Sequence, residues 1–352
     1  MSSMYNYIFL HCNEFNKTPR KIGEKLLNMK KIGIICGGYS SEYEISIKSA
    51  TTILTNFPKE YAPYLIIVNQ ENWKIKIGES SHDFDPWNFS YTSEQTTIKL
   101  DAALIYIHGT PGENGKIQAL LDIIRIPYIN SNALSSELSF DKWFCNQFLN
   151  NFGINVAKSI HLTSTESIEK AHIINELGLP CFVKPSDSGS SFGISKVMNE
   201  ESLLPALEKA FKEGDSVVIE SFLKGTEVTC GVYSTKNGIH TLPITEIVSE
   251  NDFFDYDAKY NGKSDEIIPA RISGIEAKLV EEIAIKCYQL LQLKSIARID
   301  FMLVEGKPFV IEVNTTPGFS EASIVPRMLK YKGESIQDFW KSIIEFELPK
   351  SL

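Results

Sequence analysis

A regular alternation of apolar strands and helical segments, beginning at Lys30, constrains the fold more than any other feature of the sequence. The run KIGIIC is a continuous apolar strand that stops at two glycines, and SEYEISIKSATTILTNF after it has helical periodicity. Two more apolar runs, YAPYLIIV and DAALIYIHG, precede the helical segment GKIQALLDIIRIP. Apolar strands that alternate with helices are typical of a parallel sheet covered by helices. The sequence therefore predicts a first α/β domain over residues 29–127.

The alternation continues through two further units. Residues 128–222 hold the expected helix SSELSFDKWFCNQFLNNFG, followed by the strands VAKSIHL, LPCFVKPS and DSVVIESFL with helical segments between them. Residues 223–352 hold EVTCGVYS, GIHTLPITEIVS, a long helix over residues 275–293 and the hairpin ARIDFMLVEGKPFVIEVN. The polar stretch ENDFFDYDAKYNGKSDE is longer than ordinary connections and is typical of a functional loop. We expect three domains, α/β overall and α+β in the C-terminal part.

Composition excludes several classes of function. The chain of 352 residues has a net charge of −9 and no basic run, which disfavours nucleic acid as a partner. Its six cysteines lie far apart in or beside apolar segments, as reduced thiols of a cytoplasmic protein do. No apolar run approaches the roughly 20 residues of a membrane-spanning helix. We therefore expect a cytoplasmic protein without a disulfide framework or a zinc site.

The first 28 residues stand apart from this pattern. In NMKKIGIICGG, Met29 is followed by two lysines and a strand, which has the form of a natural start. We expect residues 1–28 to be a poorly ordered extension.

The C-terminal hairpin carries polar side chains among apolar ones. Residues i and i+2 of a strand share a face, so Arg298 and Asp300 lie together, as do Glu312 and Asn314. If the strands pair across the Glu-Gly turn, two carboxylates and an amide converge as a hard oxygen set suited to Mg²⁺. A surface hairpin with salt bridges remains an alternative. The expected core face of the hairpin consists of Ile299, Phe301, Ile311 and Val313.

Two other segments have features of a nucleotide site. In VKPSDSGSSFG, Lys184 ends an apolar strand and a glycine-serine loop over residues 188–193 follows, which can close its amides over phosphates. The segment lacks the Walker A pattern, and a plain surface turn is an equal alternative. Glu220 follows a buried strand and Glu227 opens the next one; taken alone, both are ordinary edge carboxylates.

The first domain offers two candidate substrate contacts. Glu42 lies near a helix start after Gly37 and Gly38, where it could receive a substrate ammonium or simply favour the first helical turn. The spacing of these glycines does not fit a dinucleotide fingerprint. His108 lies just past a strand end, where open α/β sheets bind ligands, although a structural histidine is equally expected there.

Seven segments in the same order resemble the D-alanine–D-alanine ligases of the ATP-grasp superfamily, and the resemblance covers nearly the whole chain from Met29. The segments are GGYSSEYEIS, HGTPGENGKIQ, DKWF, FVKPSDSGSSFG, FDYDAKY, ARIDF and EVNTTPGFSEAS. The resemblance implies a three-domain ATP-grasp fold with an N-terminal parallel-sheet domain. ATP would lie between the central and C-terminal domains.

The resemblance also implies a role for individual residues. The expected ATP contacts are Lys142, Lys184, Ser191, Glu220, Leu223 and Glu227. The expected ligands of two Mg²⁺ or Mn²⁺ ions are Asp300, Glu312 and Asn314. The expected substrate contacts are Glu42 and His108 for the first D-alanine, Ser323 and Ile324 for the second, and Lys259 as a further substrate contact. Ser190 and Tyr260 would link to Glu42 and close the polar loop, and Arg298 with the Gly318 N–H would stabilise the oxyanion.

The implied activity is the ATP-dependent joining of two D-alanine molecules through a D-alanyl phosphate, for peptidoglycan synthesis, by a homodimer. Alternatives are a D-alanine–D-lactate ligase or another ATP-grasp carboxylate–amine ligase. A nucleotide-binding regulatory protein without catalysis would lose the metal ligands, and Asp300, Glu312 and Asn314 are all present. The pair Lys259 and Tyr260 is similar to the dipeptide-forming type.

Overall fold

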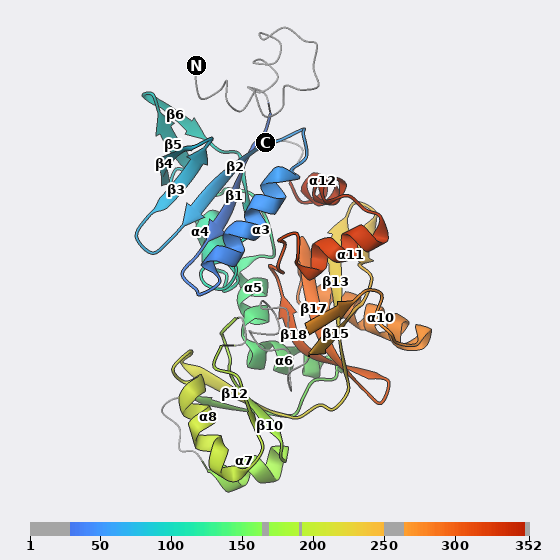
Figure 1. The fold of residues 1–352 in the computed structure, drawn as a ribbon. Helices are drawn as coiled ribbons and strands as arrows, with labels where there is room; N and C mark the ends of the chain where they lie inside the picture. Colours follow the sequence, from blue (N-terminus) through green and yellow to red (C-terminus); the bar gives the residue numbers. More distant parts are fainter. Residues whose placement is uncertain (1–28, 164–168, 190–191, 250–263, 349–352) are drawn as a thin grey trace.

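The computed structural model describes residues 29–163, 169–189, 192–249 and 264–348, and it contains three separate sheets in those ranges (Figure 1). Residues 1–28, for which the sequence predicts a poorly ordered extension, lie outside the described residues. The N-terminal sheet is at one end of the molecule, the small central sheet is at the other, and the C-terminal sheet lies between them (Figure 1).

The N-terminal sheet is parallel only in part. Strands β1, β2, β7 and β8 form the expected parallel part, and β2 continues into an antiparallel extension of β3 to β6 that the strand–helix alternation did not predict. These four strands have mixed polarity and short lengths, so their periodicity is weak. The strands are β1 (Lys31–Gly37), β2 (Ala62–Val68), β3 (Trp73–Ile77), β4 (Ser80–Asp85), β5 (Ser90–Ser93), β6 (Thr96–Lys99), β7 (Ala102–Ile105) and β8 (Tyr128–Ile129).

Helices α3 (Tyr43–Thr55) and α4 (Lys116–Ile123) pack on this sheet as the sequence predicted. Strands β1 and β7 are adjacent and parallel, so the loops after them emerge at the same edge. Glu42 and His108 lie on these two loops. The edge is fixed by Ser46, whose Oγ accepts from the Gly37 N–H at 2.9 Å and donates to the Tyr106 carbonyl at 2.7 Å.

The central unit has a four-stranded sheet in the order β11-β10-β12-β9. Its elements are β9 (Ser159–Thr163), α7 (Lys170–Leu177), β10 (Cys181–Pro185), β11 (Ser195–Val197), η2 (Glu200–Ser202), α8 (Leu203–Ala210) and β12 (Ser216–Ser221). An apolar cluster beneath α7 and α8 includes Val183, Leu207 and Ile219. Because side chains alternate along a strand, Lys184 and Glu220 lie on the opposite face of the sheet from this cluster.

The prediction of a single helix before β9 is wrong, because the chain forms two helices there, α5 (Ala133–Phe140) and α6 (Lys142–Asn151). Asp141 between them has an extended backbone with φ −79° and ψ 111°. Its side chain accepts from the Phe144 N–H at 2.9 Å, which is an N-cap contact. The break places Lys142 in the first turn of a new helix.

The C-terminal unit has a six-stranded sheet in the order β16-β15-β13-β17-β18, with β14 paired to β13. The segment GIHTLPITEIVS forms two strands, β14 and β15. The elements are β13 (Thr226–Thr235), β14 (Gly238–Thr241), β15 (Thr245–Ser249), β16 (Ser264–Ile267), α10 (Gly274–Leu290), β17 (Ile296–Val304), β18 (Lys307–Asn314), α11 (Ile324–Lys332) and α12 (Ile336–Glu347).

The hairpin of β17 and β18 has the predicted register with one difference. Arg298 pairs with Asn314 and Asp300 with Glu312, but the register shifts after Asp300, and Phe301 then pairs with Val310. Ile311 is therefore the extra residue of a β-bulge and is only half-buried, so its expected place on the core face is wrong. Val310, which is fully buried, packs there instead.

The N-terminal and C-terminal sheets share one apolar core. The largest cluster joins Ile34 and Leu104 of the first sheet to Phe319 and to Phe339 and Trp340 of α12. Tyr106, which is buried in this cluster, donates its hydroxyl hydrogen to the Pro317 carbonyl at 2.8 Å. The two units are thus held by apolar packing and by a buried hydrogen bond beside the candidate site.

Two expectations from composition can be compared with the structure. Among the described residues, no helix is both long and apolar enough to cross a membrane. The five cysteines in the described ranges, which are Cys36, Cys145, Cys181, Cys230 and Cys287, are all buried and unpaired with one another.

We predict that Tyr106→Phe lowers the free energy of unfolding by about 1 to 3 kcal/mol, because the buried Pro317 carbonyl loses its donor. Urea unfolding measures the change. Tyr64→Phe is the matched control, since the Tyr64 hydroxyl makes no hydrogen bond within the described part of the chain. Equal stability of Tyr106→Phe and wild type would contradict this account.

Glu347 at the end of α12 generates a pH-dependent prediction. Its Oε1 accepts from the Ser295 N–H, while its Oε2 is sealed from solvent and has no hydrogen-bond partner in the described ranges. Burial raises the pKa of Glu347 from 4.5 to about 8, against the opposing effect of the Ser295 N–H and of Lys294. Between these two pH values the folded chain holds a proton that the unfolded chain has released, so the stability of the wild type falls as pH rises.

We therefore expect Glu347→Gln, which cannot ionise, to gain stability relative to wild type as the pH rises from 4.5 to 8, by about 5 kcal/mol over the whole interval. Denaturant unfolding at several pH values measures this difference. Glu345→Gln, at an exposed position of the same helix, should show no such trend. A constant difference between Glu347→Gln and wild type across this range would refute the prediction.

Candidate active site

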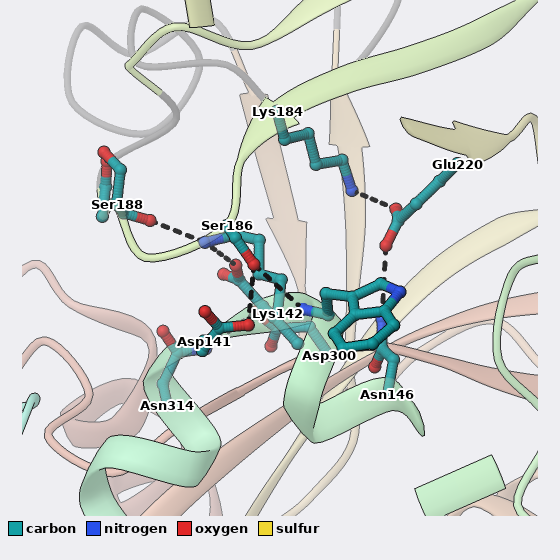
Figure 2. A network of polar contacts seen from close by, with 12 residues as sticks. Asp141, Lys142, Asn146, Lys184, Ser186, Ser188, Glu220, Asp300 and Asn314 are labelled. Atoms are coloured by element: carbon teal, nitrogen blue, oxygen red, sulfur yellow. Dashed lines mark hydrogen bonds and ion pairs between the residues drawn. The ribbon is translucent and has the colours of Figure 1, made fainter. Parts of the chain in front are cut away.

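A buried ion pair lies on the face of the central sheet that is turned away from its apolar cluster. Lys184 is the penultimate residue of β10, and its Nζ lies 2.6 Å from Glu220 Oε2 on β12 (Figure 2). The Glu220 Oε1 atom accepts from Asn146 Nδ2 at 3.2 Å, so three elements meet at one carboxylate. The sequence predicted both charged residues, and the structure joins them directly.

The charge on Lys184 is stabilised by its surroundings. Burial by itself lowers the pKa of Lys184, but the Glu220 carboxylate and its hydrogen bond, together with Glu312 and Glu227, raise it above the ordinary value of lysine. Lys184 is therefore an ammonium throughout the physiological range. A buried cation is a suitable partner for phosphate oxygens.

Lys142 connects the glycine-serine loop to the hairpin. Its Nζ donates to the Ser188 carbonyl at 2.6 Å (Figure 2). The same Nζ lies 3.9 Å from Glu312 Oε2. The preceding Asp141 accepts from Ser186 Oγ at 2.7 Å, and the Ser186 carbonyl accepts from the Lys142 N–H at 2.8 Å. The start of α6 and the start of the loop are thereby held together.

The polar face of the hairpin converges as the register predicts. The Arg298 guanidinium binds both oxygens of Asp300, with Nε–Oδ1 at 2.8 Å and Nη2–Oδ2 at 2.7 Å. Asn314 Nδ2 donates to Asp300 Oδ2 at 3.1 Å, and Thr229 Oγ1 donates to Oδ1 at 2.5 Å. The alternative of a surface hairpin is wrong, because Asp300 is only 8% exposed.

The chemistry of this donor set fits a magnesium ion. Asp300 and Glu312 lie opposite each other on the two strands, and Asn314 is two register positions away, on the same face of the hairpin. Within the described ranges no three His, Cys, Asp or Glu side chains gather as a metal-binding group. The set therefore rests on two carboxylates and one amide oxygen, and further ligands would come from phosphate and water, as is usual for Mg²⁺.

Glu42 lies against the glycine-serine loop. A Cβ atom on Gly189 would lie 2.4 Å from Glu42 Oε2, and one on Gly109 would lie 3.3 Å from the same atom. Only glycine permits so close an approach of the loop backbone at residue 189. Glu42 itself is buried at the N-terminus of α3, where its side chain makes no capping hydrogen bond. The N-terminal unit and the loop of the central unit therefore meet at this carboxylate.

His108 is held between the N-terminal and C-terminal units. Its Nε2 lies 3.0 Å from Ser49 Oγ, which accepts from the Phe319 N–H at 3.0 Å. Burial lowers the pKa of His108, against the opposing effect of Glu42. The imidazole is therefore neutral at physiological pH and can act as a hydrogen-bonding wall of the site.

Glu113 is a buried carboxylate that the sequence reasoning missed, although it lies in the quoted HGTPGEN segment. Its Oε2 accepts from the Gly109 N–H at 2.8 Å. Burial, with a contribution from Glu42, raises its pKa. Glu113 stabilises the turn between β7 and α4 by accepting this hydrogen bond. No sequence pattern marks Glu113 as buried; only its place in the folded turn does.

The bend after β18 leads into a helix N-terminus. Ser323 is the N-cap of α11, and Ile324 is buried in the first turn. Ser323 Oγ accepts from the Ser320 N–H at 3.0 Å, and a Cβ on Gly318 would lie 3.1 Å from this oxygen. A helix N-terminus with free N–H groups is suited to a carboxylate.

The remaining predicted contacts divide into two groups. Glu227 is the second residue of β13, and Leu223 is half-buried in the connection before this strand. Glu227 is among the charges that act on Lys184. The other predicted contacts lie outside the described residues: Ser190, Ser191, Lys259 and Tyr260.

Asp141 and Asn146 were also missed. Asp141 had a signal, because an aspartate before a helical run is typical of an N-cap. Asn146 lies one turn after Lys142 and 74 residues before its partner Glu220, and nothing local marks it. The assembled site has two buried ammonium groups, two adjacent carboxylates and a guanidinium, a set able to bind and polarise a phosphorylated substrate.

Two family models match most of the chain. The model described as D-ala D-ala ligase N-terminus matches residues 31–131, and the model described as D-ala D-ala ligase C-terminus matches residues 148–345. The second match contains β10, β12 and the hairpin of β17 and β18. The first contains Glu42 and His108.

Individual relatives agree with the family models. The D-alanine–D-alanine ligase of Parabacteroides distasonis is 43% identical over 322 residues, which covers 91% of this chain and 98% of the relative. Among solved structures, the VanG D-Ala:D-Ser ligase from Enterococcus faecalis has a TM-score of 0.81 and 30% identity, covering 91% of this chain and 100% of that one. D-alanyl-alanine synthetase A from Vibrio cholerae has the same TM-score at 27% identity, covering 90% of this chain and 98% of that one. The chain belongs to the D-alanine–D-alanine ligase family, and its fold is the ATP-grasp fold of that family.

Proposed function

We propose that this protein joins two D-alanine molecules to D-alanyl-D-alanine at the expense of ATP, for the synthesis of peptidoglycan precursors. Membership of the family supports this activity. The observation that carries it is the meeting of three parts at Lys142 and Gly189. Lys142 contacts the glycine-serine loop and lies 3.9 Å from Glu312, while Gly189 of the same loop lies against Glu42.

The nucleotide would occupy the space between the central sheet and the hairpin. Lys142 and Lys184 would neutralise its phosphates, with Ser191 of the loop as a further contact. Glu220 and Leu223 would lie against the adenine, and Glu227 would hold the ribose. In the structure, however, both oxygens of Glu220 bind Lys184 and Asn146, so its side chain acts first on the phosphate-binding lysine.

Asp300, Glu312 and Asn314 would hold two Mg²⁺ or Mn²⁺ ions. When bound, the metal offsets charge on the phosphoryl group. The chain's own contribution is to orient these oxygens: Arg298 and Thr229 fix Asp300 by three hydrogen bonds. Ligands held this way lose little freedom when they bind a metal.

The first step would be attack of a D-alanine carboxylate on the γ-phosphate, which gives an acyl phosphate and ADP. Glu42 would bind the substrate ammonium, because it is a buried carboxylate beside the loop that would close over the phosphates. Neutral His108 would face the same substrate and add no charge. Positioning and electrostatic stabilisation supply most of the rate enhancement in such transfers.

The second step would be attack of the second D-alanine amine on the acyl carbon, with release of phosphate. Arg298 and the Gly318 N–H would stabilise the tetrahedral oxyanion. Ser323 and Ile324 would bind the second substrate at the start of α11, and Lys259, which lies outside the described residues, would be a further substrate contact. Ser190 and Tyr260, which lie outside the described residues, would link to Glu42 and exclude water from the acyl phosphate.

We further propose that the protein acts in the cytoplasm as a homodimer and that its domains divide near residues 127 and 222. Its substrates, ATP and D-alanine, are small and anionic or zwitterionic, and neither a nucleic acid nor a membrane is needed. These proposals follow from the family and from the three separate sheets.

Purified protein should release phosphate from Mg-ATP when D-alanine is added and should accumulate D-alanyl-D-alanine. A coupled assay for ADP with chromatography of the products measures both. D-Lactate and D-serine, each offered with D-alanine, test the second substrate, since the similar VanG protein is described as a D-Ala:D-Ser ligase. ADP release with L-alanine but not with D-alanine would refute the proposed function.

Glu312→Gln should lower turnover by about 100-fold or more, because it removes one of two metal-binding carboxylates while keeping the size of the side chain. Direct titration with Mn²⁺ in the presence of ATP should show weaker metal binding, which separates this effect from a loss of fold. Glu305→Gln, at the exposed turn of the same hairpin, is the control and should behave as wild type. Unchanged metal affinity in Glu312→Gln would remove the metal role.

A further inference from the structure

Asn146 is a buried polar residue to which the proposed mechanism gives no role. It lies on α6, one helical turn after Lys142 and on the same face, and it is only 2% exposed. Its Nδ2 donates to Glu220 Oε1 at 3.2 Å, and Glu220 Oε2 accepts from Lys184 Nζ at 2.6 Å. Figure 2 shows these three side chains as one chain of contacts that crosses from α6 through β12 to β10.

The role of this chain of contacts follows from counting donors and acceptors. An ammonium group has three N–H donors. A carboxylate has two oxygens, and each of them can accept a hydrogen bond from the ammonium. Because Asn146 occupies Oε1, Glu220 offers Lys184 a single oxygen in this arrangement. The other donors of Lys184 can then turn toward phosphate oxygens without breaking the ion pair.

Without the Asn146 amide, the buried Glu220 Oε1 atom would lose the hydrogen bond that Asn146 donates to it. The carboxylate could then rotate to present both oxygens to Lys184 and compete with the phosphates for the same ammonium. The lysine would remain in the site but would be held less favourably for the nucleotide. The effect of Asn146 is therefore expected on nucleotide affinity and not on the chemistry at D-alanine.

We propose that Asn146 is a positioning residue for ATP, acting through Glu220 on the direction in which Lys184 presents its ammonium group. This proposal rests on the proposed function in one respect, the assignment of Lys184 to the phosphates. A purely structural role accounts poorly for Asn146, since its Oδ1 atom is buried and has no hydrogen-bond partner among the residues that the structure describes. Such an atom costs stability, so an apolar residue of the same size would suit the fold better.

The test uses Asn146→Leu, which keeps the approximate volume and removes both the donor to Glu220 and the unpartnered oxygen. The KM for Mg-ATP should rise about tenfold, the size expected from losing a hydrogen bond to a charged group. The KM for D-alanine should stay within about twofold of wild type, and kcat likewise, if the effect is confined to the nucleotide. Calorimetric titration with ATP in the absence of D-alanine should show the same loss of affinity.

A double-mutant cycle separates action through Glu220 from a general effect of α6. In the Glu220→Gln background, Asn146→Leu should change ATP affinity much less than it does in wild type, because the carboxylate that it controls is gone. Additive effects of the two substitutions would overturn the proposal. Gln147→Ala is the matched control: Gln147 is the next residue of α6 and donates to Ser159 Oγ at 3.2 Å, a contact between α6 and the central sheet that leaves Glu220 alone.

The outcomes distinguish this inference from the proposed function. If wild type forms no D-alanyl-D-alanine, the proposed function fails, while ATP titration still judges the role of Asn146. If wild type is active and Asn146→Leu binds ATP normally, the inference fails and the function stands. If Gln147→Ala weakens ATP binding as much as Asn146→Leu does, the effect belongs to the docking of α6 and the inference is overturned. Should Asn146→Leu not fold, Asn146→Ala in the same cycle gives the same three results.

Discussion

The pairing of β17 with β18 is the constraint on which the rest of the site depends. Because Asp300 lies opposite Glu312 and Arg298 opposite Asn314, four polar groups are brought to one face by backbone hydrogen bonds alone. A shift by one residue would exchange this face with the apolar one and would bury the charges in the core. The bulge after Asp300 ends that regular register, so Val310 and not Ile311 fills the core beneath the site.

Burial of charge is the second constraint, and the structure satisfies it by pairing. An unpaired ammonium in the position of Lys184 would tend to lose its proton, but Glu220 holds it charged. Asp300 is likewise buried and is matched by the Arg298 guanidinium. These pairs have a cost in desolvation that apolar residues would avoid, which is expected where charge serves binding and not stability.

Much of this could be predicted from the sequence, and the limits have physical causes. Period-two and helical patterns identified β1 and the hairpin correctly, because buried faces impose those periods. The break at Asp141 was missed because apolar periodicity runs on through both helices, and only the cap contact to Phe144 shows where one helix ends. The bond between Asn146 and Glu220 joins residues 74 positions apart, and no local pattern encodes such a contact.

The arrangement of the three units explains why substrate contacts come from such distant parts of the chain. The N-terminal unit is fixed to the C-terminal unit by a common core and by Tyr106, whose hydroxyl binds the bend after β18. The central unit reaches both of them through Lys142 and Gly189. A nucleotide bound at Lys184 would therefore meet Glu42 on one side and the hairpin on the other. Each unit alone presents only part of the charge that a phosphoryl transfer requires, so the chemistry depends on the contacts between units as much as on the residues themselves.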